Sequence, residues 1–252
     1  MSDNPYAAPQ VDPAPKTCSG QSELTSPYGG YRNVGKLRYL ILSLLGVGIL
    51  VTGLHIMTLL SLNEANSLIN DDSAYEESVI HYAELSAQIA QIQAILLVVT
   101  MVIWCFWKNK SCKNAWLFQS ATLASRLTRV LPSHQNITPG WAVGYYFIPI
   151  VNLWKPYQAM AFIRDQVSGK TPVGSLVGLW WTAWLITNGS SNYFYRNDNV
   201  VFYTTAEATA FNNGIITDGI LGIVASLFAA AVIQRLTVGQ ERMASEYKLL
   251  PE

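Results

Sequence analysis

The sequence predicts an all-α membrane protein with four transmembrane helices and one further segment that is broken by proline. Half of its residues are hydrophobic and only 13% are charged, a balance that favours a membrane protein over a soluble domain. Four stretches approach the roughly 20 apolar residues that a helix needs to cross a bilayer. Each crossing is expected to be helical, because backbone amides and carbonyls find no water in the hydrocarbon and must pair within the segment.

Tails are expected on both sides of this membrane domain. Residues 1–35 begin with a run rich in Pro, Ala and Ser that cannot bury enough surface to fold alone, so a disordered cytoplasmic tail is predicted. The membrane domain is predicted over residues 36–238. Residues 239–252 are then a cytoplasmic C-terminal tail.

The predicted spans are residues 37–62, 89–107, 173–187 and 214–233, of which the third is the shortest. Lys and Arg gather before the first and third spans and after the second and fourth, which places those connections in the cytoplasm. The connection at residues 63–88 contains six acidic residues and neither Lys nor Arg, so it is expected to face outward. Four crossings with both termini inside satisfy this distribution.

Two further elements are expected on the cytoplasmic side. Residues 113–131 carry apolar side chains at helical spacing opposite basic ones, which predicts an amphipathic helix on the inner leaflet or packed against the bundle. Residues 139–165 contain an apolar run of about 11 residues, which suits a re-entrant or interfacial segment. Pro149 lacks an amide donor and should end or kink a helix near Ile148.

A fifth crossing through residues 139–165 is disfavoured. It would place Asn152 and Lys155 inside the membrane, where a central lysine costs on the order of 3 kcal/mol. It would also move the basic C-terminal residues to the outside. The segment is therefore expected to enter from the cytoplasmic side and return to it.

A motif lies within this broken segment. The chain reads Pro-Gly-Trp-Ala-Val-Gly at residues 139–144, Phe-Ile-Pro at 147–149 and Asn-Leu-Trp-Lys-Pro-Tyr-Gln at 152–158. This residue pattern resembles the signature of a bacterial membrane-protein family known as domain of unknown function 4328. The resemblance extends over about residues 35–238. The resemblance implies a multi-pass protein of the bacterial inner membrane and names no activity.

A structural role is the main expectation for the motif, and solute conduction is the alternative. Two glycines would permit close approach of helices, and an asparagine and a tryptophan would tie the broken backbone to its neighbours. The motif residues singled out are Pro139, Gly140, Trp141, Gly144, Pro149, Asn152, Trp154 and Pro156.

Ionisable residues inside predicted spans are costly in lipid and are therefore candidates for function. His55 and Asp218 are two such residues, and Asp218 lies on a stripe of small residues that should face the bundle. The hypothesis is an outward-opening polar pocket with these two as a proton-sensitive or cation-binding pair. The alternative is that both are structural links between helices. The candidate pocket residues are Thr52, His55, Glu84, Gln88, Gln91 and Asp218.

The spacings that membrane enzymes need are not found in the sequence. It has no zinc-binding histidine pair, phosphate-cradling glycine loop or paired carboxylates within spans, so no catalytic residue, metal or cofactor is predicted. Nucleic acid is not an expected partner, because no basic patch with interleaved aromatics occurs outside the membrane flanks. Membrane lipid is the expected partner, with a protein partner or a second copy of the chain left open.

Three classes of function remain, in order of preference. A structural or regulatory membrane module that acts through protein or lipid contacts ranks first. A small transporter or channel with an outward-facing pocket ranks second, because one broken segment without a matching repeat is weak support for it. An intramembrane enzyme ranks last, since convergent acid, base or metal groups are missing.

Overall fold

The computed structural model describes residues 26–68, 73–125, 137–167, 174–195 and 204–249. Every regular element in these ranges is a helix, which confirms the predicted all-α class. The elements are α1 (Gly35–Ser67), α2 (Ser73–Ser125), α3 (Pro139–Gly144), the short 3₁₀ helices η1 (Tyr145–Phe147) and η2 (Val151–Leu153), α4 (Lys155–Val167), α5 (Gly174–Tyr195) and α6 (Thr205–Glu246).

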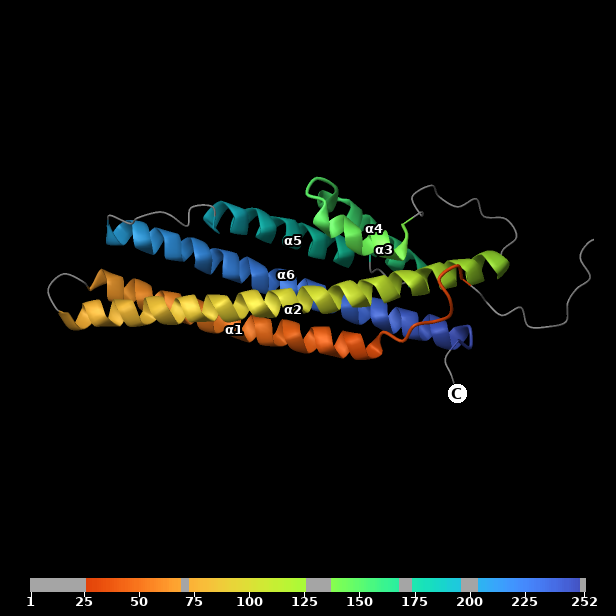
Figure 1. The fold of residues 1–252 in the computed structure, drawn as a ribbon, viewed down its shortest axis with the longest axis horizontal. Helices are drawn as coiled ribbons and strands as arrows, with labels where there is room; N and C mark the ends of the chain where they lie inside the picture. Colours follow the sequence, from red (N-terminus) through yellow and green to blue (C-terminus); the bar gives the residue numbers. More distant parts are fainter. Residues whose placement is uncertain (1–25, 69–72, 126–136, 168–173, 196–203, 250–252) are drawn as a thin grey trace, which may run out of the picture.

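Four long helices run side by side along the long axis of the molecule (Figure 1). α1 packs against α2 and α6, and α5 packs against α6. α1 and α2 run in opposite directions, as do α5 and α6 (Figure 1). The short helices α3 and α4 lie against the half of α2 that ends at Ser125. The chain therefore returns to the same end of the bundle after α2 and again after α6.

Three of the helices are long and apolar enough to cross a membrane: α1, the part Glu77–Ser120 of α2, and α6. α5, which contains the predicted third span, is not among them. It carries several tryptophans and ends in a polar stretch that includes Asn188, Ser190 and Ser191. The described helices are thus compatible with a membrane protein, and three of them are candidate spans by length and composition.

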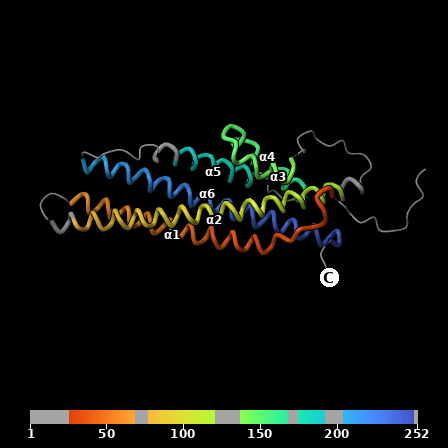
Figure 2. Tube along the Cα trace, viewed as in Figure 1, coloured from red at the N-terminus to blue at the C-terminus, as the bar shows by residue number. Residues whose placement is uncertain are grey.

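α2 is longer than the sequence analysis indicates. The predicted second span and the predicted amphipathic helix form one uninterrupted helix of 53 residues (Figure 2), which is about 80 Å long at 1.5 Å per residue. The expectation of a separate amphipathic helix is therefore wrong for residues 113–125. Cys112, Ala115 and Phe118 are fully buried, so this part of α2 packs against the bundle. The predicted residues 126–131 lie outside the described ranges.

Both predicted tails include residues that are folded. Tyr28 packs against Trp116 with ring centroids 5.8 Å apart, and Val34 is fully buried, so the chain from residue 26 onward is not a disordered tail. Residues 1–25 lie outside the described ranges. At the other terminus α6 continues to Glu246, and Gln240 and Ala244 are fully buried. The packed helical bundle therefore extends, in both directions, beyond the predicted membrane domain.

The buried core gathers at the end of the bundle where α1 begins and where α2 and α6 end. Ile41, Trp107, Ile163 and Leu236 are fully buried there, although they come from α1, α2, α4 and α6. Away from this end large apolar side chains point outward, as Leu50 does with 75% exposure. Apolar side chains that face outward are stable in lipid and unfavourable in water. The molecule thus combines a lipid-compatible half with a half that excludes water by its own packing.

Candidate functional site

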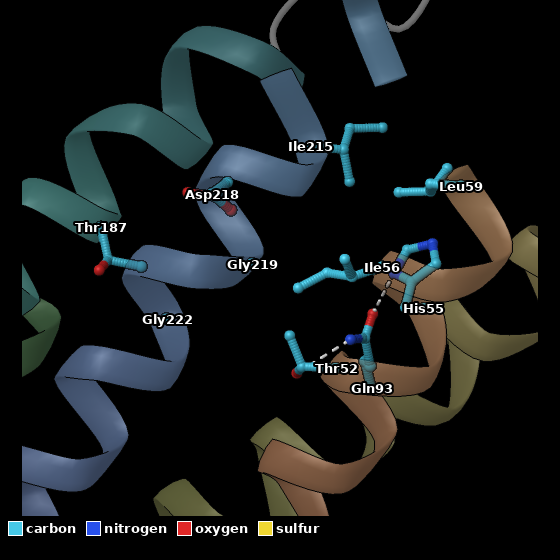
Figure 3. A pocket seen from close by; sticks show the side chains of 10 residues that line it. All are labelled: Thr52, His55, Ile56, Leu59, Gln93, Thr187, Ile215, Asp218, Gly219 and Gly222. Atoms are coloured by element: carbon cyan, nitrogen blue, oxygen red, sulfur yellow. Dashed lines mark hydrogen bonds between the residues drawn. The ribbon is translucent and has the colours of Figure 1, made fainter. Parts of the chain in front are cut away.

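A pocket of about 150 Å³ opens between α1, α2, α5 and α6 (Figure 3). This volume can hold a few water molecules or a small solute. Its walls mix hydroxyl, amide, imidazole and carboxylate groups with aliphatic side chains. The lining residues are Thr52, His55, Ile56 and Leu59 of α1, Gln93 of α2, Thr187 of α5, and Ile215, Asp218, Gly219 and Gly222 of α6.

His55 forms one wall of the pocket and is held by α2. Its Nδ1 lies 2.9 Å from Gln93 Oε1, and its Nε2 lies 2.9 Å from Ser86 Oγ. Because Gln93 Oε1 can only accept, the neutral ring carries its proton on Nδ1 and accepts the Ser86 hydroxyl proton at Nε2. Gln93 Nε2 in turn donates to Thr52 Oγ1 at 3.1 Å. This chain of hydrogen bonds fixes the orientation of a ring that is only 6% exposed.

Asp218 lies on the other wall and is held by α5. Its Oδ1 accepts a short hydrogen bond from Ser190 Oγ. Ser191 Oγ lies 2.8 Å from Asp218 Oδ2 and 3.0 Å from Oδ1. The carboxylate is therefore solvated by two hydroxyl groups of the polar end of α5. Neither ion pair of the described residues involves it.

The structure brings three of the predicted pocket residues to one cavity. Thr52 and His55 lie on the α1 side and Asp218 lies on the α6 side, so the two ionisable groups face the same space from opposite walls (Figure 3). Each is bonded to a different helix and not to the other. A functional pair of His55 and Asp218 remains a prediction.

α2 contributes to the site through a different face from the one predicted. Glu84, Gln88 and Gln91 are exposed and are not among the lining residues. Ser86 and Gln93 contact His55 in their place. These two are seven residues apart and therefore share one face of α2. That spacing was the signal by which the sequence could have identified them.

The second candidate region is the broken segment that carries the sequence motif. α3 begins at Pro139, where the Thr138 hydroxyl accepts from the backbone amide of Trp141, and is followed directly by η1. The helix ends after Phe147, and Ile148 is extended with φ −106° and ψ 108°. The predicted end of the helix near Ile148 is confirmed. Its cause is local, because Pro149 disfavours a helical conformation for the residue before it.

Side chains of α2 bind the carbonyl groups at the start of the broken segment. Asn109 Nδ2 donates to Pro139 O at 2.9 Å, and Trp116 Nε1 donates to Ile137 O at 3.0 Å. Cys112 Sγ also lies 3.6 Å from Ile137 O. Carbonyls before and within a helix break lack intrahelical partners and need such donors when they are buried. The entry of the segment is thus fixed to α2.

Lys108 binds the far end of the broken segment. Its Nζ donates to Pro156 O at 3.2 Å and to Tyr146 Oη at 2.9 Å, and it lies 4.2 Å from the centroid of the Tyr146 ring. Trp104 Nε1 donates to the same phenol oxygen at 3.2 Å. Lys108 is fully buried and belongs to neither ion pair of the described residues. The hydroxyl and ring of Tyr146 and the carbonyl of Pro156 therefore surround this amino group.

The residues predicted to stabilise the motif do not make the contacts that were expected of them. The Oδ1 atom of Asn152 is buried without a hydrogen-bond partner, and Trp154 is 43% exposed, so neither ties the backbone through its side chain. Trp181 of α5 provides a tie instead, with Nε1 3.2 Å from Leu153 O. A Cβ added at Gly140 would meet no atom within 4 Å, and one at Gly144 would meet the ring of Trp141 in its own helix. Close helix approach does not explain these glycines.

Between its two bound ends the broken segment exposes a set of large apolar side chains. Phe147 and Ile150 are 71% and 72% exposed, and their neighbours are exposed by more than a third. A contiguous apolar surface of this kind marks a contact with a membrane or a protein. We call this set the apolar tip; it consists of Phe147, Ile148, Ile150, Leu153 and Trp154.

Comparison with known protein families identifies the chain. The sequence model of a family described as "Domain of unknown function (DUF4328)" matches residues 71–238. The chain belongs to this family. The match confirms the resemblance seen in the motif. The description of the DUF4328 family names no activity. No curated protein and no solved structure matches the chain.

The DUF4328 match covers one candidate region completely and the other only in part. The broken segment, its apolar tip and the side chains that bind it all lie within residues 71–238. The pocket lies partly outside, because α1 supplies Thr52 and His55. Among the described residues, no group of three or more His, Cys, Asp and Glu is placed to hold a metal ion. The broken segment is therefore the region that belongs wholly to the DUF4328 part of the chain.

Proposed function

We propose that this DUF4328 protein is a four-span module of the bacterial inner membrane whose broken segment sits in the inner leaflet and acts through contacts with lipid or a protein partner. The apolar tip, exposed between two ends that are bound to α2, carries the proposal. A tip fixed in this way presents a constant apolar surface, because the segment cannot turn inward to bury it.

The direction of α5 supports a fourth crossing. α5 lies antiparallel to α6 over 22 residues, about 33 Å at 1.5 Å per residue, which matches the hydrocarbon thickness. Its tryptophans and terminal serines are compatible with a helix shielded by α6 on one side. With four crossings the basic connections all lie in the cytoplasm, together with both termini.

The depth of the broken segment is supported by its partners on α2. Its entry binds Asn109, whereas Tyr146, next to the tip, binds Trp104. Five residues separate these partners, about 7 Å along the helix axis. That distance agrees with the 5–10 Å by which interfacial elements bury their apolar faces. A shallow insertion from the cytoplasmic side therefore accounts for the geometry without a fifth crossing.

Single-cysteine labelling should reveal this arrangement. In a variant without native cysteines, Gly140→Cys and Lys155→Cys should react with a membrane-impermeant maleimide only from the cytoplasmic side, and Ile150→Cys should react only after detergent is added. Lipid around the tip is the reason for this protection, since thiolate formation is suppressed in hydrocarbon. Lys36→Cys and Glu64→Cys are the controls for the inner and outer faces.

Two labelling results would contradict the proposal. Reaction of Gly140→Cys and Lys155→Cys from opposite faces would mean that the segment crosses the bilayer. Reaction of Ile150→Cys in intact membranes as fast as Lys36→Cys would place the tip in water. In either case the membrane contact made by the tip would be lost as the basis of the function.

A second candidate function is the binding of a small cation in the outer pocket, as part of a transporter or channel. The pocket itself favours it, since Asp218 brings a carboxylate to a cavity that also holds Thr52, Thr187 and Gln93. The connection at residues 63–88, with its acidic residues and no Lys or Arg, would raise the local concentration of cations outside. The alternative remains a structural link between α5 and α6.

Substitutions at Asp218 separate these alternatives. Asp218→Leu should destabilise the detergent-purified protein by about 1–3 kcal/mol, because it leaves the hydroxyl of Ser191 without its acceptor, whereas Ser190 can still donate to Thr187 O. Asp218→Asn keeps an acceptor and should lose less. If the pocket binds a cation, the melting temperature of the wild type should rise when sodium replaces choline, and Asp218→Asn should abolish that rise. Glu84→Gln, an exposed carboxylate change, is the control.

The outcomes at Asp218 are distinct. Equal and negligible shifts for Asp218→Asn and Asp218→Leu would contradict a structural role for the carboxylate. A sodium-dependent rise that persists in Asp218→Asn would contradict cation binding at this residue. A sodium-independent wild type with a large loss for Asp218→Leu would leave the structural link as its role.

A further inference from the structure

The pocket of Figure 3 contains a negative group that its described lining residues do not neutralise. Asp218 accepts hydrogen bonds from the hydroxyls of Ser190 and Ser191, and Ser190 also donates to Thr187 O at 2.9 Å. An ionised carboxylate can accept about four hydrogen bonds, so part of its capacity stays open. The lining residues that the structure describes include neither Lys nor Arg. The carboxylate therefore favours a positively charged ligand that carries its own donors.

Two other polar groups of the pocket are already engaged. His55 uses one ring nitrogen on Gln93 and the other on Ser86, so it has no lone pair left for a metal ion. Thr187 Oγ1 donates to Ala183 O at 3.0 Å, and its methyl group points toward α6 (Figure 3). Hard metal cations take about six oxygen ligands. The described side chains of the pocket supply fewer, so a metal ion would have to keep much of its water.

Aliphatic groups make up most of the remaining wall. Ile56, Leu59 and Ile215 line the pocket from α1 and α6. Gly219 and Gly222 add backbone without side chains (Figure 3). A cavity of about 150 Å³ can hold a molecule the size of benzene, with about six non-hydrogen atoms. The pocket thus combines one open carboxylate with apolar space for a short hydrocarbon chain.

We infer that this pocket binds a small primary alkylammonium ion, with the ammonium group at Asp218 and the alkyl chain against Ile56 and Ile215. The inference rests on the second candidate function, because it names the class of cation that the pocket takes, and it does not depend on the apolar tip. An ammonium group needs one charged acceptor and can donate its remaining hydrogens to water. Each methylene group that the aliphatic wall buries adds about a fourfold preference.

Two other cations fit the pocket less well. Sodium has the same charge, but it gains nothing from the aliphatic wall. An ethanolamine lipid carries the same ammonium group, but the described lining residues offer no basic side chain to its phosphate. A soluble amine satisfies the carboxylate and the apolar wall together, without bringing a second charge into the pocket.

Thermal unfolding of the detergent-purified full-length protein tests this inference, at neutral pH and with choline chloride to keep the ionic strength constant. n-Propylammonium should raise the melting temperature with a half-saturating concentration at least about tenfold below that of sodium. From methylammonium to propylammonium, each added methylene should lower that concentration about fourfold. 1-Propanol has a similar size and no charge, so it should give no rise. Asp218→Asn should abolish the rise for every amine.

A substitution that fills the pocket tests the position of the ligand. Gly222 lies one turn after Asp218 on the same face of α6, and helical side chains lean toward the N-terminus of their helix. A Cβ at Gly222 would meet no atom within 4 Å, so Gly222→Leu can enter the pocket without displacing its neighbours. It should weaken propylammonium binding at least about tenfold. Gly178→Leu is the matched control, because Gly178 has the same open space but does not line the pocket, and it should leave binding unchanged.

The results separate this inference from the function on which it rests. If sodium binds through Asp218 but propylammonium binds no better, or binds equally well in Gly222→Leu, the alkylammonium class is wrong and the cation pocket stands. If neither cation raises the melting temperature, both fail. A rise that appears only in Arg196→Gln would overturn the inference, because Arg196, which follows α5 in the sequence, would then occupy the position. A rise with phosphatidylethanolamine in the micelles and none with propylammonium would assign the pocket to a lipid headgroup instead.

Discussion

Replacement of Asn114 by Leu should destabilise the protein by about 3–6 kcal/mol. Asn114 is fully buried in α2 and makes three hydrogen bonds of 2.8 Å. Its Oδ1 accepts from the backbone amide of Arg32, and its Nδ2 donates to Arg32 O and to Gln240 Oε1. Leu has the same branching as Asn and is larger, so the change removes three partners without opening a cavity. Gln240 Oε1, left unpaired in the interior, costs about 1–3 kcal/mol, and each lost bond to the exposed Arg32 adds about 1 kcal/mol.

Thermal unfolding of the detergent-purified protein measures this effect, and a fall of at least about 5 °C is expected. Asn188→Leu is the matched control. Asn188 is exposed on α5, and its Nδ2 donates to Trp184 O within its own helix. Similar shifts for the two variants would mean that burial of Asn114 does not matter. The link that it makes between the N-terminal segment, α2 and α6 would then have no energetic weight.

The continuity of α2 shows why element boundaries were harder to predict than the fold class. Apolar length and Lys/Arg asymmetry are local features, and they identified the helices. The cluster that starts at Lys108 was taken as the end of a span and also as the end of its helix. Lysine is a good helix former, and the sequence of α2 contains neither Gly nor Pro. The charge marks the end of the apolar stretch, whereas the backbone has no reason to stop there.

Packing at the end of the bundle where α2 and α6 end could not be predicted from the sequence. Asn114 and Gln240 are 126 residues apart, and Trp107 donates to Thr237 over a separation of 130. These pairs form only when α2 and α6 extend beyond their apolar stretches side by side. When the distant partner of a polar residue is unknown, the sequence alone suggests that the residue belongs to a solvent-exposed tail. That is why the C-terminal residues were assigned to a tail when they are half of a buried network.

The pocket was predicted in part because its polar residues stand out in apolar spans. Thr52, His55 and Asp218 are conspicuous for that reason. The face of α2 that meets them depends on the rotation of that helix about its axis. Each residue turns the helix by about 100°, so an error of two residues moves a side chain to the other side. Such a rotation is set by packing, and packing selected Ser86 and Gln93.

Lys108→Ala should release the far end of the broken segment and cost about 3–5 kcal/mol. The change empties a fully buried site and removes the hydrogen bonds that Lys108 donates to Pro156 O and to Tyr146 Oη. Lys108→Met should lose less, because it fills most of the volume and removes a charge that is costly to bury. Lys110→Ala is the control, two residues along the same helix and partly exposed.

A native thiol reports whether the loss is local to the broken segment. Cys112 is fully buried and lies against Ile137 O at the start of the segment, so it reacts only when the segment leaves α2. In a background where Cys18 and Cys105 are Ser, Lys108→Ala should raise maleimide labelling of Cys112 at least about tenfold, the equivalent of 1.4 kcal/mol of local opening. Asn114→Leu is the comparison of similar stability, and it acts on the other side of α2. If both variants expose Cys112 equally, the protein opens as one unit, and Lys108 has no special role in holding the apolar tip.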